Sequence, residues 1–215
     1  MPDATWTMAQ LRRHFWMIPA ERILRVPLPG TATERDVLNM NDHHNRLCEL
    51  VDGTLLEKPM GSFEGLLAGF LLHYINAYFE EDERGVALAP DGFLRYWPGL
   101  VRAPDVSVIL WDSIPGDDLP TEPIWRLVPD WAIEIYSKSN TRREMTRKRQ
   151  ECFSRGTRLF WQVYPTKKAV EVYTSVDQCT TFNGDAVLDG GDVLPGFKLP
   201  LTKLFAPRRR PRKRG

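Results

Sequence analysis

The fold is decided by the stretch VPDWAIEIYSKS, residues Val128–Ser139. Its pattern predicts a buried strand that leads directly into a helix, because Trp131, Ile133 and Ile135 occupy alternate positions. Glu134 therefore projects from the opposite face of that strand, where an unpaired buried carboxylate would be costly. It needs a cation, a hydrogen-bond donor or a metal ion. One interpretation is an ion pair inside an ordinary sheet, and the other is a functional carboxylate.

A second carboxylate stands at the start of another apolar run, Arg102–Leu110. Here Pro104 and Asp105 precede the hydrophobic residues. The chain between Asp105 and Glu134 is long enough to leave a sheet and return to it. Two carboxylates on neighbouring strands favour a hard divalent cation, because oxygen ligands suit magnesium and manganese.

Composition indicates one globular domain with extensions. The chain has 215 residues, of which 42% are hydrophobic and 27% are charged, enough for one core. The formal net charge of +1 favours no partner class by itself. Its distribution is uneven, because Arg208–Arg214 is strongly basic and the rest of the chain is net acidic. We expect residues 206–215 to form a disordered basic tail that adds salt-dependent affinity for DNA.

The three cysteines, Cys48, Cys152 and Cys179, are odd in number and far apart. This pattern indicates reduced thiols in a cytoplasmic protein rather than a disulfide framework or a zinc site. No apolar run approaches the length of a membrane span, and Met1–Gln10 lacks the order of a signal peptide. We therefore expect a cytoplasmic protein that does not contact a membrane.

The remaining elements follow from periodicity and turn chemistry. Residues 1–44 predict an irregular N-terminal extension with short helices. Leu47–Lys58 predicts a hairpin, and Gly61–Glu81 the first long helix. Gly85–Pro90 and Gly92–Trp97 are expected to be the next strand pair.

A second helix should follow the Glu134 strand. Thr141 and Glu144 have the spacing of a capping box, and the helix should end near Arg155. Beyond it, Leu159–Tyr164 and Ala169–Tyr173 predict two strands of a meander.

The sequence resembles the PD-(D/E)XK nuclease superfamily and, more narrowly, the Uma family of putative restriction endonucleases. The matching pieces are Glu49–Gly53, Pro104–Ser107, Glu134–Ser137, Lys148 and Asp189–Phe197. The ordered set is more specific than the two-residue Pro-Asp motif. The resemblance implies an α/β fold with a restriction-endonuclease-like mixed sheet flanked by helices, over residues 45–205.

The resemblance also implies a function and a site. It implies a Mg²⁺- or Mn²⁺-dependent endonuclease acting on DNA, and it is compatible with a homodimer. Asp105 and Glu134 would hold the metal. Glu64, close to the apolar stripe of the first long helix, would be an extra acid of the kind that this fold often places there. The other interpretation of Glu64 is a first-turn residue favoured by the helix dipole.

One departure from the superfamily pattern concerns a lysine. The pattern implies Lys two residues after the Glu, where this chain has Tyr136. Lys138 is close but follows the strand end. Lys148 matches a family lysine and shares one helix side with Met145 and Cys152, so we expect it to replace the missing lysine. The competing interpretation is a surface pair of Lys148 with Glu144.

Two further questions stay open at this point. Glu49 is either an acid that supports the site or an ordinary salt-bridge partner. The protein could also be a catalytically weak or inactive nuclease-fold module that binds nucleic acid, which the absent strand lysine and the acidic body favour. A third interpretation is a structural interaction protein in which Asp105 and Glu134 are satisfied ion-pair members.

Overall fold

The computed structural model describes residues 2–3, 5–59, 61–116 and 118–206. Of the expected basic tail, only Ala206 belongs to these residues, so the stretch Arg208–Arg214 lies outside them. Among the described helices, none has both the length and the apolar character that a membrane span requires.

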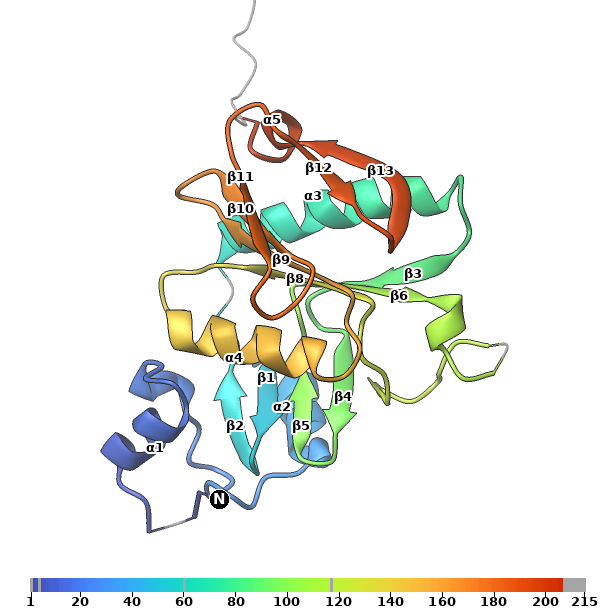
Figure 1. Cartoon of the computed structure of the whole chain (residues 1–215). Helices are drawn as coiled ribbons and strands as arrows, with labels where there is room; N and C mark the ends of the chain where they lie inside the picture. Colours follow the sequence, from blue (N-terminus) through green and yellow to red (C-terminus); the bar gives the residue numbers. More distant parts are fainter. Residues whose placement is uncertain (1, 4, 60, 117, 207–215) are drawn as a thin grey trace, which may run out of the picture.

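A mixed sheet of six strands lies at the centre of the fold (Figure 1). The spatial order is β11, β10, β9, β8, β6, β3. The strands are β3 (Gly85–Leu88), β6 (Val106–Leu110), β8 (Trp131–Ile135), β9 (Leu159–Tyr164), β10 (Ala169–Tyr173) and β11 (Cys179–Phe182). Neighbours β8 and β9 are parallel, whereas β6 and β8 are antiparallel. The predicted buried strand is therefore β8, in the interior of this sheet.

A second sheet has five strands in the order β2, β1, β5, β4, β7. Its strands are β1 (Cys48–Val51), β2 (Thr54–Glu57), β4 (Phe93–Trp97), β5 (Leu100–Arg102) and β7 (Ile124–Trp125). The hairpin turn between β1 and β2 puts Asp52 and Gly53 at φ 48° and 66°, as a tight two-residue turn requires. A separate hairpin consists of β12 (Val187–Gly190) and β13 (Leu194–Pro200).

Five α-helices surround the sheets in the described chain. They are α1 (Met8–His14), α2 (Glu34–His44), α3 (Ser62–Phe79), α4 (Arg142–Phe153) and α5 (Leu201–Leu204). Figure 1 shows α3 and α4 on opposite faces of the six-stranded sheet. Helix α3 packs against the face that carries Trp131 and Ile133. The other face carries Ala132 and Phe160 and packs with Cys152 of α4.

The predicted α/β class with a mixed sheet and flanking helices is confirmed. One expected strand pairing is wrong. β3 and β4 do not pair with each other, because β3 pairs with β6 whereas β4 pairs with β5 and β7. Strands that are consecutive along the chain often pair, but here the short connection between β3 and β4 leads from the six-stranded sheet to the five-stranded sheet. Strands β3 and β4 therefore belong to different sheets although they are consecutive along the chain.

Candidate active site

Asp105 and Glu134 meet on one face of the six-stranded sheet. Strands β6 and β8 pair with Val106 opposite Ile133, so one further step along the same register brings Asp105 opposite Glu134. The backbone N–H of Ile135 donates to Oδ2 of Asp105 at 2.6 Å. Both carboxyl groups are buried, and each residue is 4% exposed. The structure therefore brings together the two acids that the sequence singled out.

Each of these acids has a lysine partner. Lys58, which follows β2, lies with Nζ 2.9 Å from Oδ1 of Asp105 and donates to the carbonyl oxygen of Ala103. Lys148 of α4 lies with Nζ 2.9 Å from Oε1 of Glu134. These pairs offset the cost of burying the two charges, because a paired buried charge is far cheaper than a lone one.

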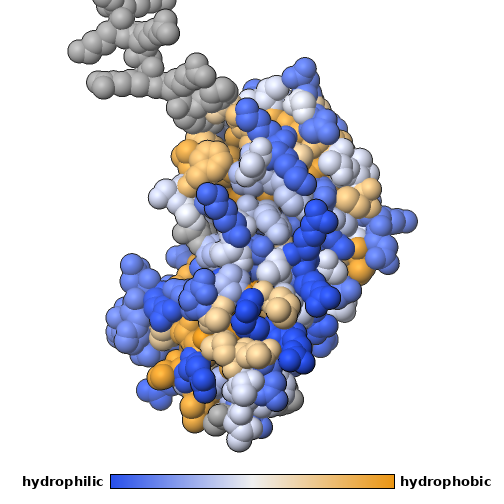
Figure 2. All heavy atoms as spheres, turned by 90° about the vertical axis from the view of Figure 1, so that its left-hand side faces the viewer, coloured by the Kyte–Doolittle hydropathy of each residue, from blue (hydrophilic) through white to orange (hydrophobic). Residues whose placement is uncertain are grey.

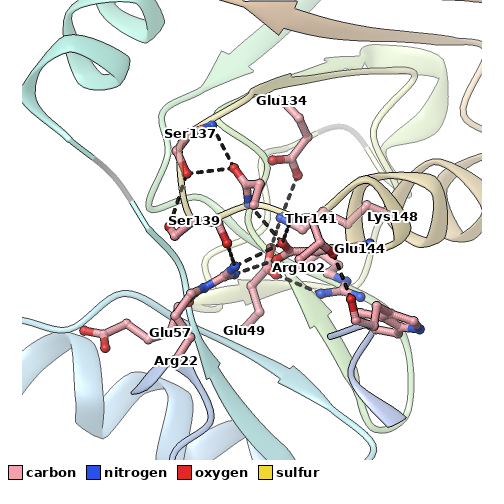
Figure 3. A network of polar contacts seen from close by, with 12 residues as sticks. Arg22, Glu49, Glu57, Arg102, Glu134, Ser137, Ser139, Thr141, Glu144 and Lys148 are labelled. Atoms are coloured by element: carbon pink, nitrogen blue, oxygen red, sulfur yellow. Dashed lines mark hydrogen bonds and ion pairs between the residues drawn. The ribbon is translucent and has the colours of Figure 1, made fainter. Parts of the chain in front are cut away.

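Lys148 is held in place by a second carboxylate (Figure 3). Its Nζ donates to Oε1 of Glu49 at 3.0 Å, and Arg102 donates to Oε2 of the same carboxylate at 2.8 Å. Arg102 in turn forms an ion pair with Glu151 of α4 at 2.7 Å. Glu49 is thus a salt-bridge partner of Lys148 and Arg102. Lys148 in turn contacts Glu134 directly.

The two carboxyl groups that Lys148 contacts have pKa values shifted in opposite directions, that of Glu49 downward and that of Glu134 upward. Burial raises the pKa of Glu49, but Lys148 and Arg102 more than offset it and leave the pKa at about 2. The pKa of Glu134 is raised, chiefly because the carboxyl group is buried. Lys148 lowers this pKa and the nearby Asp105 carboxylate raises it, so the net shift stays upward. The pKa of Lys148 lies above its usual value because Glu134 and Glu49 outweigh burial. The raised pKa favours the ammonium form of Lys148, which is a hydrogen-bond donor.

The two lysines considered from the sequence have different environments. Lys148 is 3% exposed and lies under the sheet face, so the interpretation of Lys148 as part of a surface pair does not hold. Its expected partner in that pair, Glu144, binds Arg22 instead. Lys138 is exposed to solvent. The geometry thus agrees with the expectation that Lys148 points to the acids from the helix, and its role stays a prediction.

Tyr136 takes the position that the superfamily gives to lysine. Its hydroxyl donates to the carbonyl oxygen of Asn140 at 3.0 Å. Its ring stacks on Tyr164 of β9 with centroids 5.3 Å apart and planes at 29°. Tyr136 is therefore half-buried in an aromatic pair with a strand of the same sheet.

Glu64 lies in the first turn of α3, as the sequence predicts. Its carboxylate folds back toward Gly61, the N-cap residue. Among the described contacts, none joins Glu64 to the network of Glu49, Glu134 and Lys148. Its proposed role as an extra acid stays a prediction, and a position at the helix start suits the helix dipole.

A further buried ion pair attaches the N-terminal extension to α4. Arg22 binds both carboxylate oxygens of Glu144, at 3.0 and 2.5 Å, and donates to the carbonyl oxygen of Ser139 (Figure 3). Glu144 also completes the predicted capping box with Thr141. The extension thus fixes the start of the helix that carries Lys148.

Replacing Arg22 by methionine is expected to lower the free energy of unfolding by about 3–5 kcal/mol, because it leaves the Glu144 carboxylate buried without its cation. Arg46→Met is the matched control. It breaks a pair with Glu57 whose side chains are 40% and 32% exposed, and exposed pairs contribute about 1 kcal/mol or less. Urea unfolding of both variants measures the difference. Equal losses would mean that the Arg22 pair does not anchor the extension.

Three residues of the network carry no assigned role from the sequence. They are Lys58, Arg102 and Glu151. Arg102 had a usable signal, because it ends the apolar run Leu100–Arg102 of a buried strand. Lys58 follows a hairpin strand and gives no signal of its own, because its partner Asp105 immediately precedes a strand of the other sheet.

The donor set near Asp105 and Glu134 suits a hard divalent cation. No cluster of three or more His, Cys, Asp or Glu side chains that could hold a metal occurs in the part of the chain that is described. Magnesium, however, uses one or two carboxylates and completes its shell with water and phosphate oxygens. Lys148 contacts Oε1 of Glu134, and none of the hydrogen bonds within the described part of the chain involves Oε2 of that carboxylate. Two carboxylates therefore fit such an ion.

Comparisons with known proteins agree with this picture. The sequence model of the family Uma2, described as a putative restriction endonuclease, matches residues 34–202. Among solved structures, a putative nuclease from Anabaena variabilis is similar, with a TM-score of 0.66 and 23% sequence identity. The similarity covers 75% of this chain and 90% of that one, and at this identity it shows the shared fold. No curated protein matched the chain. Together the matches support a nuclease.

Proposed function

Because the chain belongs to the Uma2 family of putative restriction endonucleases, we propose that it is a divalent-metal-dependent endonuclease that hydrolyses phosphodiester bonds in DNA. We further propose that it acts in the cytoplasm, either as a monomer or as a homodimer. The observation that carries the proposal is the meeting of Asp105 and Glu134 on one sheet face, with the Lys148 ammonium 2.9 Å from Glu134.

Asp105 and Glu134 would hold Mg²⁺ or Mn²⁺. When bound, the ion would lower the pKa of an attacking water and stabilise negative charge on the phosphate. Hydrolysis of a phosphodiester needs both effects, because the water is a weak nucleophile and the transition state gathers charge on the phosphate oxygens.

Lys148 supplies a fixed positive charge beside this site. Since its pKa is raised, it serves as a hydrogen-bond donor to the attacking water or to a phosphate oxygen. Glu49 and Arg102 act through Lys148, because they fix the position of its Nζ. Lys58 acts in the same way on Asp105. The network is pre-organised, so little rearrangement is needed when the substrate arrives.

A second candidate function is nucleic-acid binding without efficient cleavage. The observation that favours it is that both acids already have a lysine partner, so the site is charge-balanced without a metal ion. The replacement of the strand lysine by Tyr136 points in the same direction. Both candidates share the fold, and an activity measurement separates them.

The test is cleavage of supercoiled plasmid and of single-stranded DNA with Mn²⁺, with Asp105→Ala beside the native protein. We expect nicked or linear plasmid with the native protein and neither with the variant. Binding of Mn²⁺, measured by calorimetry, should be lost in the same variant. DNA binding without cleavage at any metal concentration would reject the endonuclease in favour of the second candidate.

A further inference from the structure

A polar pocket lies between α4 and the strands β9 and β10, beside the proposed catalytic acids. It has a volume of about 240 Å³ and is lined by Arg142, Arg149, Gln162, Tyr164 and Lys167, among others. A second pocket of about 250 Å³ shares Arg142, Tyr164 and Lys167 with it and adds Tyr136. Because three residues line both pockets, the two pockets are adjacent, and we refer to them together as the depression. No function of the protein described so far uses it.

The depression borders the acids through the sheet register. Gln162 of β9 lies directly beside Glu134 of β8, at the strand spacing of about 4.8 Å. On the other side of Gln162, its partner on β10 is Glu171. Tyr136 lies two residues beyond Glu134 on the same strand face. Helix α4 covers both regions, because it presents Lys148 to the acids and Arg149, the next residue, to the pocket.

The cations of the pocket are available to a ligand. Within the described chain, none of Arg142, Arg149 and Lys167 forms an ion pair with a carboxylate. The guanidinium of Arg149 lies 3.9 Å from the centroid of the Tyr173 ring, and its buried Nε has no hydrogen-bond partner among the described residues. A buried donor of a charged group calls for an acceptor, and a phosphate oxygen is a strong one.

The carboxylate in the pocket, Glu171, is already engaged. It accepts hydrogen bonds from the hydroxyls of Tyr164 at 2.9 Å and Tyr173 at 2.7 Å. Gln162 donates to the same Tyr164 hydroxyl at 2.8 Å. These bonds fix the rings, so the pocket presents three cations against one occupied carboxylate.

Aromatic rings complete the recognition surface. Tyr136 and Tyr164 stack on each other, and Lys167 lies 5.2 Å from the centroid of the Tyr164 ring. In Figure 1, the ends of β8 and β9 and the start of α4 lie on the left-hand side. Figure 2 shows this side facing the viewer. In that view hydrophilic residues gather around the middle of the surface. Cations beside stacked aromatic rings are typical of sites for unpaired nucleotides.

We propose that this depression is a subsite for one unpaired nucleotide of the substrate strand, next to the scissile phosphodiester. Its phosphate binds Arg142 and Arg149, and its base lies against the Tyr136–Tyr164 pair. The subsite deepens the proposed nuclease function and rests on it for the position of the scissile bond. It assigns a role to Tyr136, the residue that replaces the superfamily lysine: the ring is part of a platform for the base. The preferred substrate is then single-stranded DNA or a frayed end rather than a closed duplex, because a paired base cannot leave its stack without cost.

The test is binding, measured by fluorescence anisotropy in EDTA so that no cleavage occurs. The probes are a labelled single-stranded oligonucleotide, a hairpin-closed duplex of the same sequence, and deoxyadenosine monophosphate as competitor. The double variant Arg142→Met with Arg149→Met removes both phosphate contacts. Arg143→Met is the matched control, because Arg143 is an exposed neighbour on α4 that does not line the pocket.

We expect the double variant to bind the single strand at least about 10-fold more weakly, and the slope of log affinity against log salt to fall by about 1.4 for two lost phosphate contacts. Tyr164→Leu should weaken binding by about 10-fold and relieve the quenching of a 2-aminopurine base, whereas Tyr164→Phe, which keeps the ring, should not. Circular dichroism confirms that each variant is folded. If Tyr164→Leu does not fold, the arginine variants still decide.

Two outcomes would overturn the subsite: equal losses in the double variant and in Arg143→Met, or tighter binding of the closed duplex than of the single strand. Failure of the nuclease itself has a different signature. In that case the native protein would not cleave with Mn²⁺, while the pocket variants would still lose strand binding. Conversely, unchanged binding in the pocket variants of a protein that cleaves would reject the subsite alone.

Discussion

Replacing Glu134 by glutamine is expected to reduce metal-dependent cleavage by at least about 1000-fold, or about 4 kcal/mol in activation free energy, while the protein stays folded. Glutamine keeps the size and hydrogen-bonding capacity of the side chain but removes the negative charge that would hold the cation. Folding should persist because Lys148 keeps its second partner, Glu49, at 3.0 Å.

The measurement is single-turnover cleavage of supercoiled plasmid at several Mn²⁺ concentrations. Asp130→Asn is a suitable control. Asp130 is also buried and immediately precedes the same strand, but it accepts hydrogen bonds from Leu110 and Ser113 and lies outside the Glu134 network. We expect the control to retain cleavage within about 10-fold of the native protein if it folds. Cleavage by Glu134→Gln at the native rate and the same metal concentration would remove Glu134 from the site.

Replacing Lys148 by methionine is expected to reduce cleavage by about 100-fold or more, the effect of losing a charge contact to the transition state. The structure adds a second expectation. Lys148 is shared by two buried carboxylates, so its loss should also lower the free energy of unfolding by about 3–5 kcal/mol. Loss of activity in this variant therefore has to be separated from loss of stability.

A double variant makes that separation. Lys148→Met combined with Glu49→Gln removes one carboxylate with the cation, so part of the stability should return whereas cleavage should not. Lys138→Met is the control for charge on the surrounding surface, because Lys138 is exposed and should cost little activity. Abolished cleavage in Lys138→Met with full cleavage in Lys148→Met would show that the wrong lysine has been assigned.

Local sequence determined most elements around the site. Alternating Trp131, Ile133 and Ile135 predicted the strand β8, and the capping box of Thr141 and Glu144 predicted the start of α4. These features depend on neighbours along the chain, so they can be read from spacing. The same alternation assigns Glu134 to the face opposite the large apolar residues. The spacing of Met145, Lys148 and Cys152 predicts that Lys148 lies on the side of its helix that packs on the sheet.

Pairing between strands could not be read in this way. The sequence favours β3 with β4, yet β3 joins β6 and β4 joins the five-stranded sheet. Both segments are apolar, and both satisfy their backbone hydrogen bonds in either arrangement. The choice depends on which partner buries more apolar surface after the whole chain has folded, and local periodicity does not contain that information.

By itself, then, the sequence determined two carboxylates on buried strands, a lysine on the sheet-facing side of the next helix and the fold class. The tertiary structure alone decided which cations meet those acids. Lys58 comes from one sheet to an acid of the other, and Arg22 comes from the N-terminal extension to α4. Tyr136 likewise gains its stacking partner from β9. The physical reason is the same in each case: a buried charge or ring is stabilised by whatever lies beside it in space, and these partners are distant along the chain.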